Sequence, residues 1–181
     1  MSYYKYTYTY IHNMEIYNIR PIVSSDYANN YLSLLAQDFS IAPTDISLSE
    51  FTNYIHTLHD GHQIFVIQAP LHTTEYTTEY YMCNTNTRSR QHIIGSVTIF
   101  IEIKLIHNFG KVAHIEDVIV DNECRGKGLG KLLVQKCIDY ARTHNCYKII
   151  LNCSDENIPF YEKCGFSKKE NEMALYFTYT I

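Results

Sequence analysis

Apolar residues in the first third of the chain change from a two-residue spacing to a three- or four-residue spacing, which predicts a strand followed by two helices. Glu15–Arg20 alternates as a half-buried strand does, and Pro21 stops it. Ser24–Asp26 offers N-caps for the first helix, and Ser47–Glu50 has the spacing of a capping box for the second, which Gly61 would end. The apolar positions of these helices are Tyr27, Ala28, Tyr31, Leu34 and Leu35, then Phe51, Tyr54, Ile55 and Leu58.

Two later segments are rich in β-branched residues and predict neighbouring antiparallel strands, Gln63–Gln68 and Ile93–Lys104. The run Pro70–Gln91 between them is polar and long for a hairpin connection, so we interpret residues 70–91 as a polar insertion. The first dozen residues alternate Tyr and Thr without a clear apolar face. Residues 1–13 are therefore either a disordered tail or an added edge strand.

The second half of the chain alternates strand and helix patterns. The predicted elements are a strand at His114–Val120, a helix from Leu129 to near Asn145, a buried parallel strand at Tyr147–Leu151, a short helix at Asn157–Cys164 closed by Gly165, and a last strand at Met173–Phe177. This order predicts one α/β domain over residues 14–181, with a single mixed, mostly antiparallel sheet and helices on both faces.

Composition narrows the classes of function. The chain has 181 residues, of which 46% are hydrophobic and 19% charged, as in a folded globular protein. Its net charge of −4 argues against a nucleic-acid partner. No apolar stretch reaches the ~18 residues of a membrane span, and Met1–Asn13 lacks the apolar core of a secretory signal, so we expect no membrane association and a cytoplasmic location. Six cysteines without a CxxC pair and nine scattered histidines predict reduced thiols and no metal site.

The main chemical motif lies between the predicted strand at His114–Val120 and the helix that follows it. Alternate glycines leave backbone N–H groups accessible where that helix begins, and basic side chains add positive charge. The spacing fits neither a dinucleotide fingerprint nor a Walker loop. We therefore predict a pyrophosphate-binding turn, which a Cβ at either of its last two glycines should weaken. Its residues are Arg125, Gly126, Lys127, Gly128, Leu129, Gly130 and Lys131.

This turn resembles the R/Q-x-x-G-x-G/A acetyl-CoA loop of the GNAT superfamily of N-acetyltransferases. Four segments resemble more narrowly the branch of that family that acetylates glucosamine 6-phosphate: His114–Val118, Arg125–Leu133, Cys146–Leu151 and Asn157–Phe166. The similarity is dense from Ile99 to Phe177 and thin before Gln63. It implies the GNAT fold, acetyl-CoA as cosubstrate, an amino sugar phosphate as acceptor and a homodimer.

The resemblance also implies roles for residues around the reacting atoms. In this fold the strand equivalent to His114–Val120 splays from its neighbour, which frees backbone groups of Val118, Ile119 and Val120 for the pantetheine arm and the thioester. Asn157 would bind the same arm, and Tyr161 would protonate the departing thiolate. Glu116 and Asp117 would contact the amine, with Glu116 the favoured base. As neighbours on a strand, these two carboxylates are expected to point to opposite faces.

A phosphorylated acceptor requires a second cationic site. The resemblance assigns it to Lys104, His107, Tyr147 and Lys148, the last two at a homodimer interface, and matches Ser40 loosely to a sugar-contacting hydroxyl. Two positions depart from the family pattern. Asn152 stands where members typically carry Asp, so the negative charge that would bind the substrate ammonium must come from Glu116 and Asp117. Tyr176 stands where some members have a phosphate-binding Arg.

Two other functions stay open. The same fold could acetylate a protein or polyamine amine, which would require an acidic groove, or the chain could be a non-catalytic acyl-CoA sensor. Thiol release with a panel of amines distinguishes the acceptors, and a sensor would bind acetyl-CoA without turnover.

Overall fold

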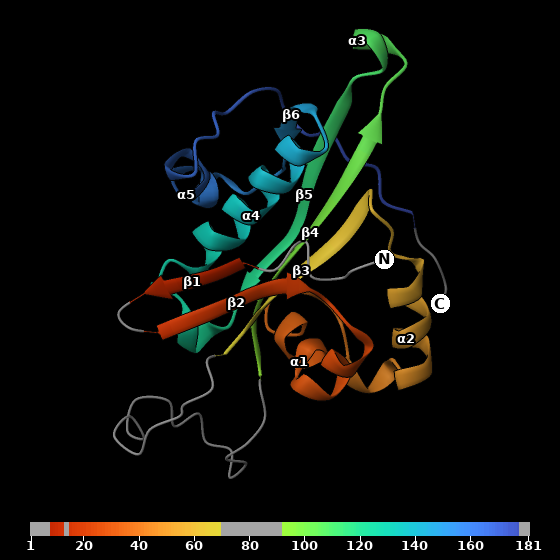
Figure 1. Ribbon diagram of the computed structural model, residues 1–181, viewed down its shortest axis with the longest axis vertical. Coiled ribbons are helices and arrows are strands. Elements are labelled where there is room, and N and C mark those ends of the chain that lie inside the picture. Colours follow the sequence, from red (N-terminus) through yellow and green to blue (C-terminus); the bar gives the residue numbers. More distant parts are fainter. Residues whose placement is uncertain (1–7, 13–14, 70–91, 178–181) are drawn as a thin grey trace.

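A computed structural model describes residues 8–12, 15–69 and 92–177. Six strands form one sheet in chain order, and all neighbours are antiparallel except the last pair, β5 and β6, which is parallel (Figure 1). The strands are β1 Tyr8–His12, β2 Glu15–Pro21, β3 His62–Gln68, β4 Ile93–Ile103, β5 Lys111–Val120 and β6 Cys146–Ile150. The predicted mixed, mostly antiparallel sheet is confirmed.

Helices cover both faces of the sheet, as the sequence predicted (Figure 1). On one face α4 buries Leu133 and Cys137 against Phe65 and Ile99 of the central strands. On the other face α1 and α2 cover a second apolar cluster. The helices are α1 Tyr31–Leu35, α2 Leu48–Thr57, α3 Ile106–Phe109, α4 Leu129–Thr143 and α5 Ile158–Lys163.

The first predicted helix is divided in two. Residues Ser24–Asn29 form a 3₁₀ turn, Asn30 has a left-handed φ of 69°, and only then does α1 begin. The prediction of one continuous helix was wrong because the left-handed conformation of Asn30 interrupts the helical backbone. Asp26, expected among the N-caps, is instead the third residue of the 3₁₀ turn and is buried. Its carboxylate accepts hydrogen bonds from the Arg20 guanidinium at 2.8 and 2.7 Å and from the Val23 N–H at 2.9 Å.

The second helix follows its capping box. Ser47 Oγ accepts the Glu50 N–H at 3.2 Å, and the Glu50 carboxylate accepts the Ser47 N–H at 2.8 Å. The helix ends at Thr57, before Gly61, which lies in the turn into β3. Residues 8–12 correspond to the edge-strand alternative for the N-terminal segment. The expected insertion at residues 70–91 lies outside the described residues.

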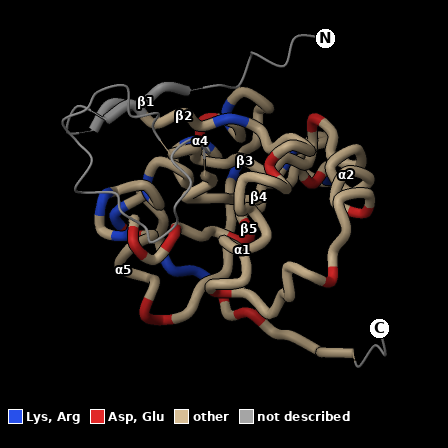
Figure 2. Tube along the Cα trace, turned by 90° about the horizontal axis from the view of Figure 1, so that it is seen from below, with Lys and Arg blue, Asp and Glu red and all other residues tan. Residues whose placement is uncertain are grey.

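Two C-terminal expectations were wrong. The strand β6 is parallel to β5, but it is the edge of the sheet rather than a buried strand, so Tyr147 and Ile150 are exposed. Residues 173–177 form no strand, because no described neighbour pairs with them. The segment runs along the outside of the body (Figure 2), and its Met173 is 95% exposed.

Every helix within the described residues is too short or too polar to cross a bilayer. The same part of the chain contains no three His, Cys, Asp or Glu side chains gathered closely enough to hold a metal ion. Its five cysteines are free thiols, and Cys83 lies outside the described residues.

Candidate active site

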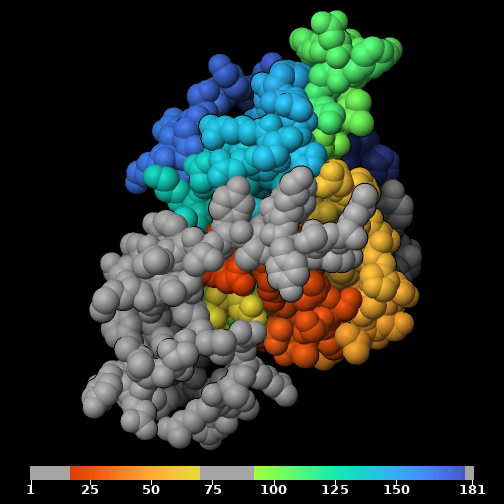
Figure 3. Space-filling view, viewed as in Figure 1, coloured from red at the N-terminus to blue at the C-terminus, as the bar shows by residue number. Residues whose placement is uncertain are grey.

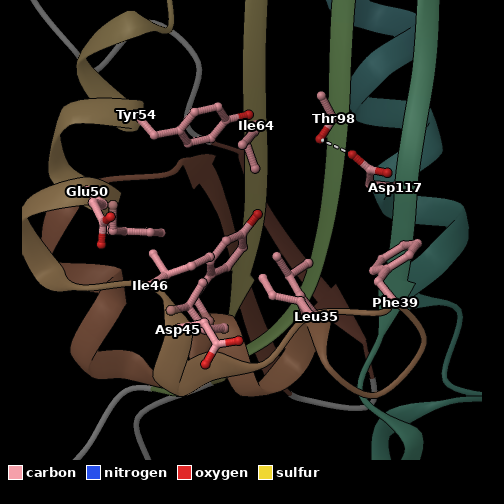
Figure 4. A pocket seen from close by; sticks show the side chains of 13 residues that line it. Leu35, Phe39, Asp45, Ile46, Glu50, Tyr54, Ile64, Thr98 and Asp117 are labelled. Atoms are coloured by element: carbon pink, nitrogen blue, oxygen red, sulfur yellow. Dashed lines mark hydrogen bonds between the residues drawn. The ribbon is translucent and has the colours of Figure 1, made fainter. Parts of the chain in front are cut away.

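A β-bulge shapes the middle of β5. Thr98 pairs with Glu116 and Ser96 pairs with Ile119, so β5 has one residue more than β4 between these pairs. Asp117 takes up the extra residue with a φ of 52°. Its carboxylate accepts a hydrogen bond from Thr98 Oγ1 at 3.3 Å (Figure 4). Thr98 therefore contacts Asp117 as well as pairing with Glu116.

The bulge therefore corrects the expectation that Glu116 and Asp117 point to opposite faces. Ile115 and Val118 on either side of them pack into the core beneath α4. Both carboxylates lie on the other face, because the extra residue interrupts the two-residue alternation of the strand. One face of the sheet thus presents two adjacent carboxylates.

The pKa of Glu116 is raised above that of an ordinary glutamate. Burial is the main cause, and the negative charge of Asp117 adds to it. Glu172 in the C-terminal segment raises the pKa further, whereas His114 opposes these effects. Glu116 consequently accepts a proton more readily than an isolated carboxylate would.

The edge of β5 that faces β6 is open beside these carboxylates. The parallel pairing of the two strands runs only as far as His114 and Ile150. From Ile115 to Val120 no described strand pairs with β5 on this side, as the expected splay requires. Backbone N–H and C=O groups there can bond an extended ligand as another strand would.

The glycine turn lies at the end of this open edge. Gly126 and Gly128 have φ values of 78° and 81°, and an added Cβ would meet nothing within 4 Å at either position. Gly128 is also the N-cap of α4 and has no side chain to bond the first N–H groups of this 15-residue helix. Open space, uncapped N–H donors and the helix dipole together fit a diphosphate.

Two other residues of the turn contact protein instead. The Leu129 side chain is buried in the core. A Cβ on Gly130 would lie 3.2 Å from Phe160 Cζ on α5, so a substitution there would also disturb the packing of α5. Gly130 lets α5 approach α4 closely, and its side-chain position does not face the open space at the other glycines.

The Arg125 side chain also points to protein groups. Its Nε donates to the Val120 carbonyl at 3.0 Å, and its terminal nitrogen bonds an Asp38 carboxylate oxygen at 2.5 Å. Lys131 is exposed on the first turn of α4, and Lys127 is partly exposed within the glycine turn. Both lysines add positive charge close to the uncapped start of α4.

Sequence reasoning missed the contact between the glycine turn and the loop after α1. Besides the Asp38 pair, Gln37 donates to the Asp121 carboxylate at 2.9 Å and accepts the Asn122 N–H at 3.0 Å. We name Gln37, Asp38, Asp121, Asn122 and Arg125 the loop clamp. These partners are more than eighty residues apart in sequence, so no local pattern could have indicated them.

Tyr161 lies half-buried on α5, between the rings of Phe160 and Phe166 at 4.9 and 6.1 Å. Burial is the main cause that raises its pKa to about 12, and nearby thiols and Glu116 contribute. The phenol therefore keeps its proton at neutral pH. The influence of Glu116 also indicates that these two candidate catalytic groups are near one another. Asn157, the N-cap of α5, donates to Ser154 Oγ at 3.2 Å.

Most of the predicted phosphate-binding residues gather at the tip of the β4–β5 hairpin, which projects beyond the rest of the molecule (Figure 3). The His107 and Tyr147 rings lie 4.8 Å apart, and Lys148 Nζ is 5.9 Å from the Tyr147 ring. Lys104 forms an ion pair with Glu102. Ser40 and Asn152 are exposed outside this group, in the loop after α1 and directly after β6.

A cavity of about 550 Å³ lies between β3–β5, α1, α2 and the intervening loop (Figure 4). Sequence analysis did not identify it, because its walls come from six different elements. Nine of the lining residues are apolar or aromatic, one is Thr98, and three carry carboxylates. They are Tyr31, Leu32, Leu35, Phe39, Ile41, Ile46, Phe51, Tyr54 and Ile64, with Asp45, Glu50 and Asp117.

Comparison with known proteins finds relatives of this chain. Residues 44–166 match the family "Acetyltransferase (GNAT) family". The chain is 37% identical over 164 residues to glucosamine 6-phosphate N-acetyltransferase of Arabidopsis thaliana, covering 90% of this chain and 98% of the relative. It is 34% identical to the enzyme of the same name from Candida albicans, with coverages of 89% and 96%. The crystal structure of the Arabidopsis enzyme superposes with a TM-score of 0.74 at 34% identity, covering 90% of this chain and 99% of that one.

Proposed function

Since the chain belongs to the GNAT family of acetyltransferases, we propose that it transfers the acetyl group of acetyl-CoA to the amine of D-glucosamine 6-phosphate. The observation that carries the proposal is the open edge of β5, which joins the uncapped start of α4 to the paired carboxylates of the bulge. Acetyl-CoA supplies the acetyl group as a thioester. The acceptor is inferred from relatives that match nearly the whole chain.

The glycine turn and the open strand edge would hold the two parts of acetyl-CoA. N–H groups of residues 126–131 would bond the diphosphate, with Lys127 and Lys131 nearby. Backbone groups of Val118, Ile119 and Val120 would bond the pantetheine, and an N–H there would stabilise the charge that develops on the thioester oxygen. Asn157 at the start of α5 would bond the same arm.

The two glycines that differ in environment give a matched pair of variants. Gly128→Ala forces an L-residue to a φ of 81° in open space, so we expect acetyl-CoA affinity to fall about tenfold. Gly130→Ala pushes Phe160, the neighbour of Tyr161, and should lower kcat while acetyl-CoA affinity stays within twofold. Isothermal titration with CoA and steady-state kinetics measure the two effects. Equal loss of affinity in both variants would contradict these separate roles.

The amine of the acceptor would lie between Glu116 and Asp117. Glu116 would accept a proton from the ammonium directly or through water, and the free amine would attack the thioester carbon. The C–N bond forms as the C–S bond breaks, the nitrogen loses its second proton to solvent, and the Tyr161 phenol passes its proton to the departing sulfur. Solvent then restores the phenol proton and takes the proton from Glu116.

A raised pKa of Glu116 has a defined effect on the pH profile. The carboxylate is the active form, so kcat/KM should fall as pH drops through this pKa, above the usual range of glutamate. Asp117→Asn removes the neighbouring charge and should move this acid limb to lower pH, and Asn tolerates the φ of 52°. Glu172→Gln, which removes a weaker influence, should move it less. An acid limb that stays in place in Asp117→Asn would contradict Glu116 as the base.

A second copy of the chain would complete the phosphate site. At ~3.3 Å per strand residue, Lys104 lies roughly 20 Å along β4 from Thr98, which is longer than a hexose phosphate. Lys104, His107, Tyr147 and Lys148 of one protomer would therefore serve the carboxylates of its partner. Apolar exposure at the hairpin tip and along the C-terminal segment supports a homodimer, with Leu105 81% and Tyr176 91% exposed.

The homodimer gives a further prediction. Leu105→Asp places a charge in the exposed apolar tip and should convert the protein to a monomer in analytical ultracentrifugation. The monomer should bind acetyl-CoA normally and lose most turnover of glucosamine 6-phosphate. Glu123→Lys, an exposed charge change away from the tip, serves as the control and should stay dimeric. A wild-type protein that sediments as a monomer would refute the shared site.

A thiol-release assay across several amines tests the proposed function as a whole. We expect glucosamine 6-phosphate to be acetylated faster than glucosamine or a lysine peptide. Faster turnover of the peptide would favour the protein or polyamine alternative, and acetyl-CoA binding without any turnover would favour the sensor. Free thiols in the described residues fit a reducing compartment, and we propose a cytosolic location.

A further inference from the structure

We propose that His114 and Glu102 are positioning residues for acetyl transfer: together they place a positive charge beside Glu116, which keeps this carboxylate ionised as the pH falls. The proposal rests on the acetyl-transfer function above, in which Glu116 is the base. The charge supplies what the other carboxylate of the bulge, Asp117, cannot, because a negative neighbour favours the protonated form of Glu116.

His114 lies on the same face of the sheet as Glu116. One residue separates them on β5, and the bulge comes only after Glu116, so the two-residue alternation of the strand holds between them. Ile115, the residue between them, packs into the core beneath α4. The imidazole and the Glu116 carboxylate therefore project from the face opposite α4 as neighbours along one strand.

Two contacts fix the orientation of the His114 ring. It stacks on Phe100 of β4, with ring centroids 4.3 Å apart and an interplanar angle of 9°. Its Nε2 lies 3.2 Å from one Glu102 carboxylate oxygen, and the other oxygen of that carboxylate pairs with Lys104. Glu102 keeps a proton on Nε2 by accepting it, so the ring gains a positive charge when Nδ1 is protonated as well. Histidine makes this change at mildly acidic pH, where the base must stay ionised.

The remaining charged groups near Glu116 are negative. Burial and the charges of Asp117 and Glu172 raise the pKa of Glu116, whereas His114 lowers it. Tyr161 is also near, but its own pKa of about 12 keeps it neutral. A base in these surroundings would be protonated early as the pH falls. A cation two residues away on the same face counteracts this protonation.

The strands on either side of His114 bring no competing charge at the paired positions. Phe100 of β4 and Ile150 of β6 lie opposite it. His62 of β3 meets Phe100 edge-on, with ring centroids 6.4 Å apart, so the phenyl ring stands between the two histidines. Glu102 is the charged group in contact with the His114 ring, and it acts on Glu116 through that ring.

The test follows the acid limb of kcat/KM for glucosamine 6-phosphate. His114→Gln removes the charge and should move the limb to higher pH by about half a unit, whereas His114→Arg supplies a permanent charge and should move it to lower pH. The His114 side chain is 20% exposed, so both replacements can be accommodated. Glu102→Gln should act like His114→Gln and add nothing to it in the double variant. His62→Gln, the same change beyond Phe100, is the control and should leave the limb in place.

Opposite shifts in the two His114 variants support the proposal, because a packing defect does not depend on the sign of a charge. A limb that stays in place in both variants, or moves in the same direction in both, overturns it. Nuclear magnetic resonance of the Glu116 carboxyl carbon in the full chain gives the same comparison without an acceptor. If these resonances shift as expected but glucosamine 6-phosphate is not acetylated, the proposed function fails and the link from His114 to Glu116 stands. If the titration of Glu116 is the same in all variants, the link fails whichever acceptor is used.

Discussion

Tyr161→Phe is expected to lower kcat for acetyl transfer about 100-fold, while the Kd for acetyl-CoA stays within twofold. The variant removes one hydroxyl from a ring held by Phe160 and Phe166, so packing on α5 is kept. Without the phenol proton, the thiolate must leave as an anion or take its proton from water, and general acids typically contribute 10²-fold or more. Stopped-flow or steady-state thiol release measures the loss.

The pH dependence of the wild-type enzyme provides an independent check. With a pKa raised to about 12, the phenol of Tyr161 is protonated at every pH below that value. Its acid function should therefore cause no alkaline fall in kcat between about pH 7 and 10.

Tyr54→Phe is the control for Tyr161→Phe. It removes a hydroxyl at the cavity and should leave turnover of glucosamine 6-phosphate within twofold. A kcat of Tyr161→Phe within threefold of wild type would exclude Tyr161 as the acid.

Asp26→Ala is expected to reduce the free energy of unfolding by about 3 kcal/mol, the loss typical of breaking a buried ion pair. Asp26 is fully buried, and its partner Arg20 is 17% exposed. The substitution leaves the guanidinium and the Val23 N–H without the carboxylate that satisfies them. Urea denaturation followed by circular dichroism measures the change.

The ion pair can be separated from packing with two further variants. Asp45→Ala changes an exposed carboxylate and should alter stability by less than about 0.5 kcal/mol. Arg20→Met combined with Asp26→Leu removes both charges and should recover part of the loss, because no charge is then buried alone. A single Asp26→Ala variant that loses under 1 kcal/mol would show that the pair contributes little.

Short-range patterns predicted most of the fold. The capping box at Ser47–Glu50, the apolar stripe of α4 and the β-branched runs of β3 and β4 all report on local structure, and the structure follows them. The first predicted helix is interrupted at Asn30, whose left-handed conformation the apolar spacing did not indicate. The predicted strand at 173–177 did not form, because a strand needs a neighbour to pair with and none is present among the described residues of one chain.

The candidate site could be predicted in part for a similar reason. The glycine turn is contiguous in sequence, so its place before α4 was evident. The faces of Glu116 and Asp117 depended on a bulge, which comes from the register of β5 against β4. The direction of the Arg125 side chain depended on its ion pair with Asp38, which lies 87 residues away in sequence. Residue types indicate candidate chemistry, but register and long-range partners decide where each side chain points.

The loop clamp bears on the kinetic scheme of the enzyme. Asp38 holds the Arg125 guanidinium beside the glycine turn, and Phe39, the next residue, lines the cavity. If the diphosphate of acetyl-CoA bound the Arg125 guanidinium, Asp38 would lose its partner. The loop that carries Asp38 and Phe39 would then be free to move at the cavity. The two substrates would then bind in a preferred sequence, nucleotide before amine, and by thermodynamic linkage each would alter the dissociation constant of the other by the same factor.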